Sequence, residues 1–274
     1  MPFLRGRMMN KTLKEIEDRL SGFSSVAVAF SGGVDSTFLL AAAKRAKLKK
    51  LIAVHVACQF VPQKETEFAK QMARTIGVEL LCLEVDIFKN EDVVSNSAQR
   101  CYHCKKEIFS LIKEKAKQEG IASLLHAVNL DDLADYRPGL KAAEELGFLA
   151  PLAEAGFTKD DIRRLSKEMG LETWDKPSQS CLATRIPYGK KILSDDLVRI
   201  DKAEAVLQDL GFDPVRVRCH GTLARIEVTA DRAVMLFEEP VRQKISTLFK
   251  RIGFAYTSVD IDGYITGKMN DEIR

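Results

Sequence analysis

The sequence predicts an α/β fold with a doubly wound parallel sheet, followed by a smaller C-terminal α+β domain. Two observations carry this prediction. Short apolar runs alternate with amphipathic stretches of helical spacing, which is typical of parallel strands covered by helices on both faces. This alternation stops near residue 175. We therefore expect a sheet domain over 1–175, a linking loop over 176–194 and a C-terminal domain over 195–274.

The elements of the sheet domain follow one another in a regular order. The first helix has Leu13, Ile16 and Leu20 at helical spacing and ends at Gly22. Four apolar runs then read as strands, because each is short and continuous and most are followed by an amphipathic stretch. The expected strands are 25–30, 50–58, 79–87 and 123–130, and the helices between them are 36–46, 64–77 and 105–120. Parallel strands joined in this way have right-handed crossovers.

The C-terminal domain has a different pattern. A helix over 195–210 precedes two strands, over 214–220 and 223–228, and a long helix over 231–253 leads to a last strand over 256–262. That order predicts a compact α+β unit of the ferredoxin-like kind. The segment before it shows no clear helical or strand period, so we interpret it as a loop with a purpose of its own.

Composition restricts the function classes. The formal net charge of +3 arises from 42 basic and 39 acidic residues, and no block of five or six like charges occurs, which argues against a nucleic-acid-binding tail. No apolar run reaches the ~18 residues that span a bilayer, and the N-terminus lacks the apolar core of a secretory signal. We therefore expect a cytoplasmic protein without a membrane partner. In that reducing compartment the six cysteines are read for metal binding or catalysis rather than for disulfides.

A glycine turn, Ser31–Ser36 with the sequence SGGVDS, follows the first expected strand. Ligands of open α/β sheets bind at this place, beyond the carboxyl ends of the strands. Two glycines let backbone N–H groups approach an anion, and the helix that begins near Asp35 adds its positive end. The turn therefore predicts a phosphate cradle, whereas the simpler alternative is a glycine-rich turn in which Asp35 or Ser36 caps the helix. The candidate nucleotide contacts are Ala29, Ser31, Gly32, Gly33, Asp35 and Ser36.

Three cysteines lie where a metal or a nucleophile is expected. Cys101 and Cys104 form a C-x-x-C pair, which suits soft metals, iron–sulfur clusters or thiol exchange. Cys181 lies in the linking loop beside Arg185, whose charge would favour a reactive thiolate. A zinc site needs four ligands, and no histidine is an obvious fourth. Three thiolates without a clear fourth ligand suit a [4Fe–4S] cluster with one open iron.

The other three cysteines are expected to be structural. Cys58 and Cys82 lie in predicted buried strands, where cysteine behaves as a small apolar residue. Cys219 alternates with Arg216 and Arg218 along its strand, so it is expected to point to the opposite, inward face.

The sequence resembles a known family over almost its whole length. SGGVDS matches the SGGxDS signature of the PP-loop ATP pyrophosphatases. Together with DDLADYRPGLKA (131–142), CLATRIPYG (181–189), LGFDPVRVRCH (210–220) and GYITGKMND (263–271), it makes the chain similar to the LarE family. Those proteins are ATP-dependent sulfur transferases that mature the nickel-pincer nucleotide cofactor of lactate racemase. One departure is the HAVNLDD segment (126–132), where many PP-loop enzymes have Gly-Thr.

The resemblance implies a substrate and a mechanism. The substrate would be pyridinium-3,5-biscarboxylic acid mononucleotide, whose carboxylates are adenylylated with ATP and converted to thiocarboxylates with sulfur from a sulfide donor. One variant of the family gives up the sulfur of a lone cysteine in the CLAxRIPYG segment. The other adds a C-x-x-C pair and holds a [4Fe–4S] cluster with all three thiols. This chain, with Cys101, Cys104 and Cys181, resembles the second variant, and a homo-oligomer is expected as in the family.

The same resemblance suggests a magnesium site. Asp35 and, more weakly, Asp131 would hold Mg²⁺ against the phosphates, because hard cations prefer carboxylate oxygens. The alternative for Asp131 and its neighbours Asp132 and Asp135 is a role as turn and cap residues at a strand end.

Basic residues complete the expected substrate site. Arg216 and Arg218 lie two apart on one strand, and by family position they would bind the phosphate of the substrate nucleotide; the alternative is a solvated strand face. Arg137 and Arg185 are further candidates for balancing negative charge. The remaining family positions are acidic and are expected to be surface carboxylates: Glu204 and Glu227.

Two other functions are compatible with these residues. A transfer-RNA thiolase also combines a PP-loop with three cysteines around a cluster, but the near-neutral charge counts against a polynucleotide partner. A non-catalytic zinc-holding or nucleotide-sensing module would use the same three cysteines as structural ligands.

Overall fold

The computed structural model describes residues 11–134, 138–265 and 268–269, which form two compact units. Unit 1 comprises Met1–Ala57, Gln63–Val85 and Cys101–Ser178, and unit 2 comprises Cys58–Pro62, Asp86–Arg100 and Gln179–Arg274. Two short segments from the first hundred residues therefore belong with the C-terminal part of the chain. Across these described ranges, no helix has the length and the hydropathy of a membrane span.

Unit 1 contains a five-stranded sheet in which all strands are parallel, in the order β3-β2-β1-β4-β5. β1 is central: its Val28 pairs with Ala53 of β2 on one side and with Leu125 of β4 on the other. The predicted doubly wound parallel sheet is confirmed, with a short fifth strand that the sequence did not indicate. The strands are β1 (Ser25–Ala29), β2 (Lys50–Ala57), β3 (Glu79–Glu84), β4 (Ser123–Leu125) and β5 (Phe148–Leu149).

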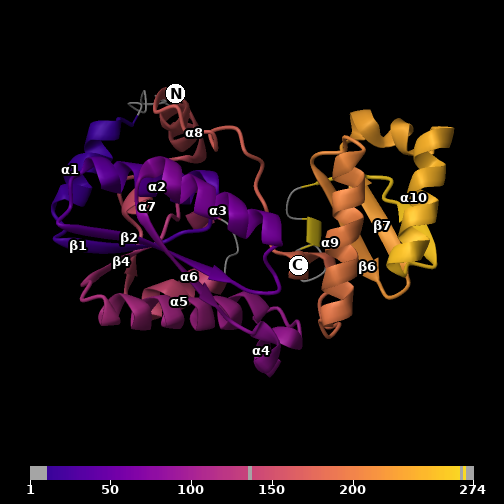
Figure 1. The fold of residues 1–274 in the computed structure, drawn as a ribbon, viewed down its shortest axis with the longest axis horizontal. Helices are drawn as coiled ribbons and strands as arrows, with labels where there is room; N and C mark the ends of the chain where they lie inside the picture. Colours follow the sequence, from indigo (N-terminus) through magenta and orange to yellow (C-terminus); the bar gives the residue numbers. More distant parts are fainter. Residues whose placement is uncertain (1–10, 135–137, 266–267, 270–274) are drawn as a thin grey trace, which may run out of the picture. The chain divides into compact units, whose positions relative to one another are not determined.

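Helices cover both faces of this sheet (Figure 1). Successive residues of β1 point to opposite faces. Val26 and Val28 pack into one apolar cluster with α1, α2, α3 and α8, whereas Ala27 packs into a second cluster with α5 and α6. The helices of this part are α1 (Leu13–Ser21), α2 (Val34–Arg45), α3 (Gln63–Ile76), α5 (Arg100–Gln118), α6 (Pro138–Glu145), α7 (Pro151–Glu154), α8 (Lys159–Glu168) and the 3₁₀ helix η2 (Asp131–Ala134).

Side-chain caps fix where two of these helices begin. Thr12 and Glu15 form a capping box at α1, and Thr158 and Asp161 form one at α8. Each cap satisfies two backbone N–H groups that a helix start leaves unpaired, and the loss of such a cap typically costs about 1 kcal/mol. The cap on Thr158 makes Lys159 the first residue of α8, which matters for the site described below.

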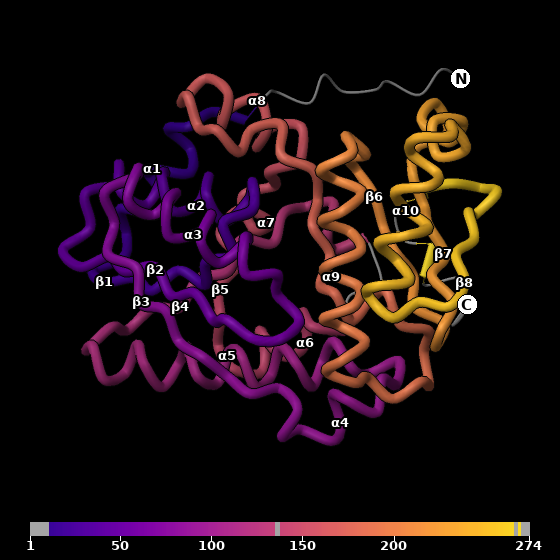
Figure 2. The backbone as a smooth tube through the Cα atoms, turned by 45° about the vertical axis from the view of Figure 1, so that its right-hand side comes forward, coloured from indigo at the N-terminus to yellow at the C-terminus, as the bar shows by residue number. Residues whose placement is uncertain are grey.

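Unit 2 is built on a three-stranded mixed sheet in the order β6-β7-β8, with α9 and α10 packed on it (Figure 2). β6 and β7 are antiparallel, and β7 and β8 are parallel neighbours. The ferredoxin-like prediction is wrong in this respect, because a split βαβ unit has another strand between the two parallel ones. The elements are η1 (Ile87–Lys89), α4 (Glu91–Val94), η3 (Leu182–Arg185), α9 (Ser194–Asp209), β6 (Val215–His220), β7 (Leu223–Val228), η4 (Ala230–Phe237), α10 (Glu239–Ile252) and β8 (Tyr256–Val259).

The long helix expected over 231–253 consists of two elements. The 3₁₀ helix η4 ends at Phe237, and α10 begins at Glu239 with Pro240 in its first turn. Proline has no N–H and is accepted at a helix start, where that group would have no partner in the helix. The break therefore follows from Pro240. α10 then packs on α9 through buried side chains such as Phe249.

A buried histidine lies at the end of β4. His126 is packed against the rings of Phe109 and Phe148, with ring centroids 6.0 and 6.4 Å away. Burial, with a contribution from the charge of Lys105, lowers the pKa of His126 from 6.5 to about 4. The folded state therefore keeps this imidazole neutral under conditions in which the unfolded chain protonates it.

We expect this difference to make unit 1 less stable in acid. As the pH falls from 6.5 towards 4, the unfolded state binds a proton that the folded state does not, so the free energy of unfolding decreases by about 3 kcal/mol from His126 alone. A His126→Phe variant should lose that part of the slope when urea unfolding is measured at several pH values. Parallel slopes for the two proteins over this range would contradict the assignment.

Candidate active site

The glycine turn leaves the carboxyl end of β1 and enters α2. Gly32 has a φ of +75°, a conformation that side chains other than glycine rarely adopt. Gly33 is the N-cap residue of α2 and supplies no side-chain cap, so the first N–H groups of the helix are left to a ligand. The hydroxyls of Ser31 and Ser36 lie 3.0 Å apart, and Ser31 Oγ accepts the N–H of Gly33 at 3.3 Å. This is the geometry of a phosphate cradle.

Helix α3 packs against the glycine turn. A Cβ on Gly32 would lie 3.0 Å from both Cα and Cβ of Ala69, so the turn touches α3 as closely as glycine allows. His55 of β2 adds a second connection, with Nδ1 2.9 Å from the carbonyl oxygen of Phe30 and Nε2 3.1 Å from Thr66 Oγ1. Because a carbonyl only accepts, Nδ1 carries the proton and the Thr66 hydroxyl donates to Nε2 of the neutral ring. Burial lowers the pKa of His55 and favours that neutral form.

Asp35 lies in a small polar network at the ends of β1 and β4. Its carboxylate accepts from the Asn129 amide at 3.2 Å and from Lys159 Nζ at 2.5 Å. Asp131 accepts the backbone N–H of Lys159 at 2.7 Å, so it orients the start of α8. Magnesium bound with a nucleotide often uses only one or two carboxylates besides phosphate oxygens, and Asp35 fits that limited requirement. Arg137 and Asp135 lie outside the described residues.

The three candidate cysteines are distributed over both units. Cys101 and Cys104 lie at the start of α5 in unit 1, three residues apart and hence on one side of the helix. Cys181 is the N-cap residue of η3 in unit 2. All three are half-buried. Within the described residues of either unit, no three Cys, His, Asp or Glu side chains form a preformed metal site, so convergence of the three thiols stays a prediction.

The remaining cysteines differ in part from expectation. Cys219 is buried, as expected, and burial raises the pKa of its thiol to about 11, which makes it unreactive. The prediction that Cys58 and Cys82 belong to the core is wrong: Cys58 is half-buried and Cys82 is exposed. The physical reason for Cys82 is that β3 is the edge strand of the sheet and is not covered on both faces.

Two arginines hold the backbone around Cys181. Arg185 is 1% exposed; its Nε and Nη2 bind Glu204 at 2.8 and 3.0 Å, and its Nη1 donates to the carbonyls of Ser180 and Cys181. Arg218 donates to the carbonyl of Thr184 at 2.7 Å. The donors of Arg185 are thus directed at Glu204 and at the loop backbone. Its role in this structure is to shape the loop.

Strand β6 is buried on both faces, which overturns the expected surface position of two acidic residues. Glu204 is 6% exposed and Glu227 is fully buried, because each forms a two-point ion pair with an arginine. Arg218 contacts Glu227 through Nε and Nη2 at 2.8 and 2.7 Å. The alternating charges of the strand resembled a solvated face, but Arg218 is ion-paired with Glu227 inside unit 2 and Arg216 stacks on Tyr264.

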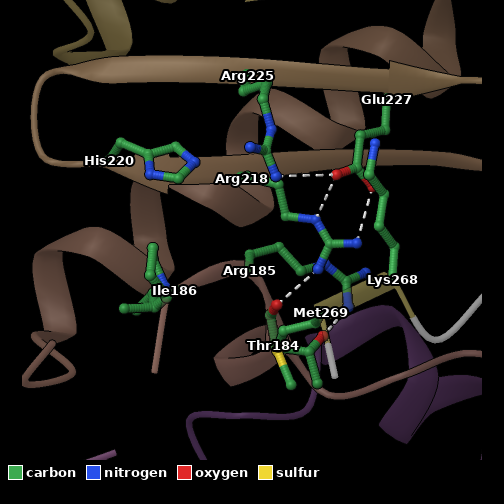
Figure 3. A pocket seen from close by; sticks show the side chains of 10 residues that line it. Thr184, Arg185, Ile186, Arg218, His220, Arg225, Glu227, Lys268 and Met269 are labelled. Atoms are coloured by element: carbon green, nitrogen blue, oxygen red, sulfur yellow. Dashed lines mark hydrogen bonds and ion pairs between the residues drawn. The ribbon is translucent and has the colours of Figure 1, made fainter. Parts of the chain in front are cut away.

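A cavity of about 280 Å³ lies beside this ion pair (Figure 3). Four basic side chains and one carboxylate line it, a balance that suits an anionic ligand. Arg216 is placed differently from Arg218: its guanidinium stacks over the Tyr264 ring at 5.1 Å, and burial, together with the charge of Arg185, lowers its pKa. The charged lining residues are Arg185, Arg218, Arg225, Lys268 and Glu227.

Several residues of these sites were not singled out from the sequence. Lys159 gives no signal, because it meets Asp35 across 124 residues of chain. Asn129 lies in the HAVNLDD segment, at the end of a strand. Ligands of such sheets bind at strand ends, so this position could have indicated Asn129 as a site residue. Arg225 and Lys268 share Asp260, with contacts of 3.2 and 2.7 Å, and only the GYITGKMND string pointed towards Lys268.

The contact between the glycine turn and α3 gives a matched pair of variants. Gly32 and Gly77 both have φ near +75°, but a Cβ on Gly77 would meet nothing within 4 Å. Gly77→Ala should cost only the backbone strain, about 1–2 kcal/mol of stability. Gly32→Ala should in addition displace the turn and weaken ATP binding at least about tenfold by isothermal titration calorimetry. Equal ATP affinities of the two variants would show that the close approach is unimportant.

The Arg185–Glu204 pair should dominate the stability of unit 2. Glu204→Gln leaves a buried guanidinium without its counter-charge, which costs about 3–5 kcal/mol of unfolding free energy in urea titrations. Glu168→Gln is the control, because Glu168 pairs with Arg164 on the exposed surface of α8, where such pairs are worth less than about 1 kcal/mol. Comparable losses in the two variants would refute the assigned role of burial.

Comparison with known proteins assigns the chain to a family. The PP-loop domain family matches residues 6–136. An uncharacterized protein from Synechocystis sp. is 34% identical over 263 residues, covering 96% of this chain and 98% of that protein. Pyridinium-3,5-bisthiocarboxylic acid mononucleotide synthase from Lactiplantibacillus plantarum is 34% identical over 257 residues, covering 93% and 92%. A tRNA-specific 2-thiouridylase from Rickettsia felis is 28% identical, but over only 56% of this chain and 52% of that enzyme. The chain therefore belongs to the LarE family, the PP-loop family of ATP-dependent sulfurtransferases that includes the Lactiplantibacillus synthase.

Proposed function

We propose that this protein adenylylates the carboxylates of pyridinium-3,5-biscarboxylic acid mononucleotide and converts them to thiocarboxylates, a step in making the nickel-pincer cofactor of lactate racemase. The observation that carries the proposal is the similarity to the Lactiplantibacillus synthase, which extends over both units of the chain and not only over the PP-loop domain. The glycine turn and the basic cavity of unit 2 supply two separate anion sites, as a reaction between ATP and a second nucleotide requires.

The first step activates a carboxylate that has no good leaving group of its own. A carboxylate oxygen of the substrate attacks the α-phosphorus of ATP, the bond to the β-phosphate oxygen breaks, and pyrophosphate leaves. The N–H groups of the glycine turn bind the phosphates, and Asp35 would hold Mg²⁺ against them. In this structure the Lys159 ammonium is paired with Asp35, so Mg²⁺ would have to displace it from the carboxylate.

The second step brings sulfur to the activated acyl carbon. A sulfur nucleophile forms the C–S bond and AMP leaves with the electron pair of the C–O bond. When bound to three cysteines, a [4Fe–4S] cluster with one open iron would supply this sulfur as a replaceable sulfide. The soft thiolates of Cys101, Cys104 and Cys181 are suitable ligands for it. Alternatively the Cys181 thiolate forms a thioester as AMP leaves. Loss of the Cα proton of residue 181 then breaks the Cβ–S bond, which leaves the thiocarboxylate and a dehydroalanine, as in the single-cysteine variant of the family.

The substrate phosphate would bind in the basic cavity of unit 2. Arg218 and Arg185 line this cavity, and Arg218 keeps its guanidinium fixed through Glu227. A pre-oriented guanidinium loses less freedom on binding a phosphate than a mobile one. Arg216 is not among the described residues that line this cavity, and the phosphate contact expected of Arg137, which lies outside the described residues, stays a prediction.

Metal analysis separates this proposal from its alternatives. Anaerobically purified protein should contain iron and labile sulfide, absorb near 400 nm and form thiocarboxylate through many turnovers with ATP, substrate and sulfide. Cys101→Ala/Cys104→Ala should lose the iron and fall to at most one sulfur transferred per chain. Cys82→Ala is the control, because Cys82 is exposed on an edge strand outside the predicted ligand set.

Three results would contradict the proposal in different ways. Full multiple turnover by the Cys101→Ala/Cys104→Ala protein would exclude a role for the cluster. Stoichiometric zinc without iron would favour a structural metal site. Tight retention of transfer RNA with a steep salt dependence would favour a transfer-RNA thiolase.

A further inference from the structure

Asn96 contacts the backbone of the loop that follows Cys181. It is fully buried and has a φ of +59°, which asparagine tolerates better than most residues. Its amide donates to the carbonyls of Ile186, Pro187 and Lys190 at 3.3, 2.8 and 3.0 Å. Its own carbonyl accepts the N–H of Gly189 at 3.0 Å. The amide nitrogen has two hydrogens, so two of these three contacts share one of them, and a single side chain contacts three carbonyls of one loop.

Arg100 contacts the same loop at a position nearer to Cys181. It lies four residues after Asn96, is 1% exposed, and donates to Asn96 Oδ1 and to the carbonyl of Ala183 at 3.2 Å. Its guanidinium also stacks over the Tyr188 ring at 5.2 Å. Ala183 is two residues beyond Cys181, inside the short helix η3 that Cys181 caps. Asn96 and Arg100 together therefore contact the loop from Ala183 to Lys190.

Burial of these two polar side chains costs more free energy than a purely structural contact with the loop would require. Burying an arginine and an asparagine requires that their polar atoms be satisfied, and apolar side chains would pack the same space without that requirement. Backbone carbonyls that accept from fixed donors have a defined direction, so the loop is held in one conformation. The residue at the start of that loop is the proposed sulfur-handling Cys181.

We propose that Asn96 and Arg100 are positioning residues for Cys181: they fix the backbone of the 181–190 loop and thereby the direction of the thiol. Arg100 directly precedes Cys101 in the chain. The residue that contacts this loop is thus also the first residue of α5, the helix that carries the C-x-x-C pair. The inference rests on the proposed function where it assigns a consequence to the sulfur-transfer step. It does not rest on that function where it concerns the exposure of Cys181.

The first experiment measures the exposure of Cys181 without any catalytic assay. Alkylation by iodoacetamide is followed peptide by peptide in metal-free protein, with Cys82 as the exposed and Cys219 as the buried internal reference. Arg100→Gln and Asn96→Asp should change the rate at Cys181 at least about fivefold, towards the rate of Cys82, because the loop loses its fixed donors. Arg100→Lys keeps the charge but loses the planar guanidinium. Its alkylation rate at Cys181 should lie between the rates of these variants and that of the unchanged protein.

Arg163→Gln is the matched control. Arg163 also donates to two backbone carbonyls, those of Trp174 and Lys176 at 2.8 and 2.9 Å, but it does so within unit 1. It should lower thermal stability without changing the alkylation rate at Cys181. Rates at Cys181 within twofold of the unchanged protein in Arg100→Gln, Arg100→Lys and Asn96→Asp would overturn the proposal. If Arg100→Gln fails to fold, Arg100→Lys and Asn96→Asp decide it by the same criterion.

The second experiment separates the two half-reactions. Pyrophosphate release from ATP and substrate uses the glycine turn, and it should stay within about twofold in Arg100→Lys. Thiocarboxylate formation depends on a correctly directed sulfur, and displacement of a reacting group can lower its rate by tenfold or more. An equal loss in both half-reactions would indicate general damage and contradict positioning. If the unchanged protein makes no thiocarboxylate at all, the proposed function fails, whereas the alkylation result still decides the role of Asn96 and Arg100.

Discussion

The structure of unit 2 depends on satisfying the backbone carbonyls of residues 180–190. Part of this segment is buried and only the short helix η3 pairs some of its backbone, so the other carbonyls need donors, because an unpaired buried carbonyl costs about 1–3 kcal/mol. Three buried arginines and one buried asparagine supply them: Arg100, Arg185, Arg218 and Asn96. Each charge then needs its own compensation, which Glu204 and Glu227 provide for two of the arginines. The two ion pairs, Arg185–Glu204 and Arg218–Glu227, therefore accompany the burial of the loop.

The sheet domain was predictable because its determinants are local. Continuous apolar strands, amphipathic helices and the SGGVDS turn each lie within a few residues, and the parallel sheet with a phosphate cradle at its carboxyl end follows from them. The partners of the turn were not predictable. Ala69, Thr66 and Lys159 reach it from α3 and α8, and nothing in a short window of sequence links them to residues 31–36.

The C-terminal site shows the opposite case. Arg216, Arg218, Glu204 and Glu227 were recognised as notable residues, but their environment was misjudged for the two carboxylates. Alternating charged and apolar residues on a strand predict one solvent-exposed face only if no other element covers that face. In β6 the second face is covered, and ion pairing makes the charges compatible with burial. The choice between the two environments depends on partners distant in sequence, so the pattern alone does not contain it.

The interleaving of the two units affects how the chain can be made and divided. Phe60 accepts the N–H of Leu182, and Val94 accepts that of Ile192, so pieces of the first hundred residues complete a structure whose bulk is translated last. During translation, apolar side chains of these early segments stay uncovered until more than eighty further residues have been synthesised. They include Phe60, Val93 and Val94. A fragment that starts at Gln179 lacks these segments altogether. No single cut in the gene separates the two units, and a genetic exchange that replaces one of them must also carry two short insertions of the other.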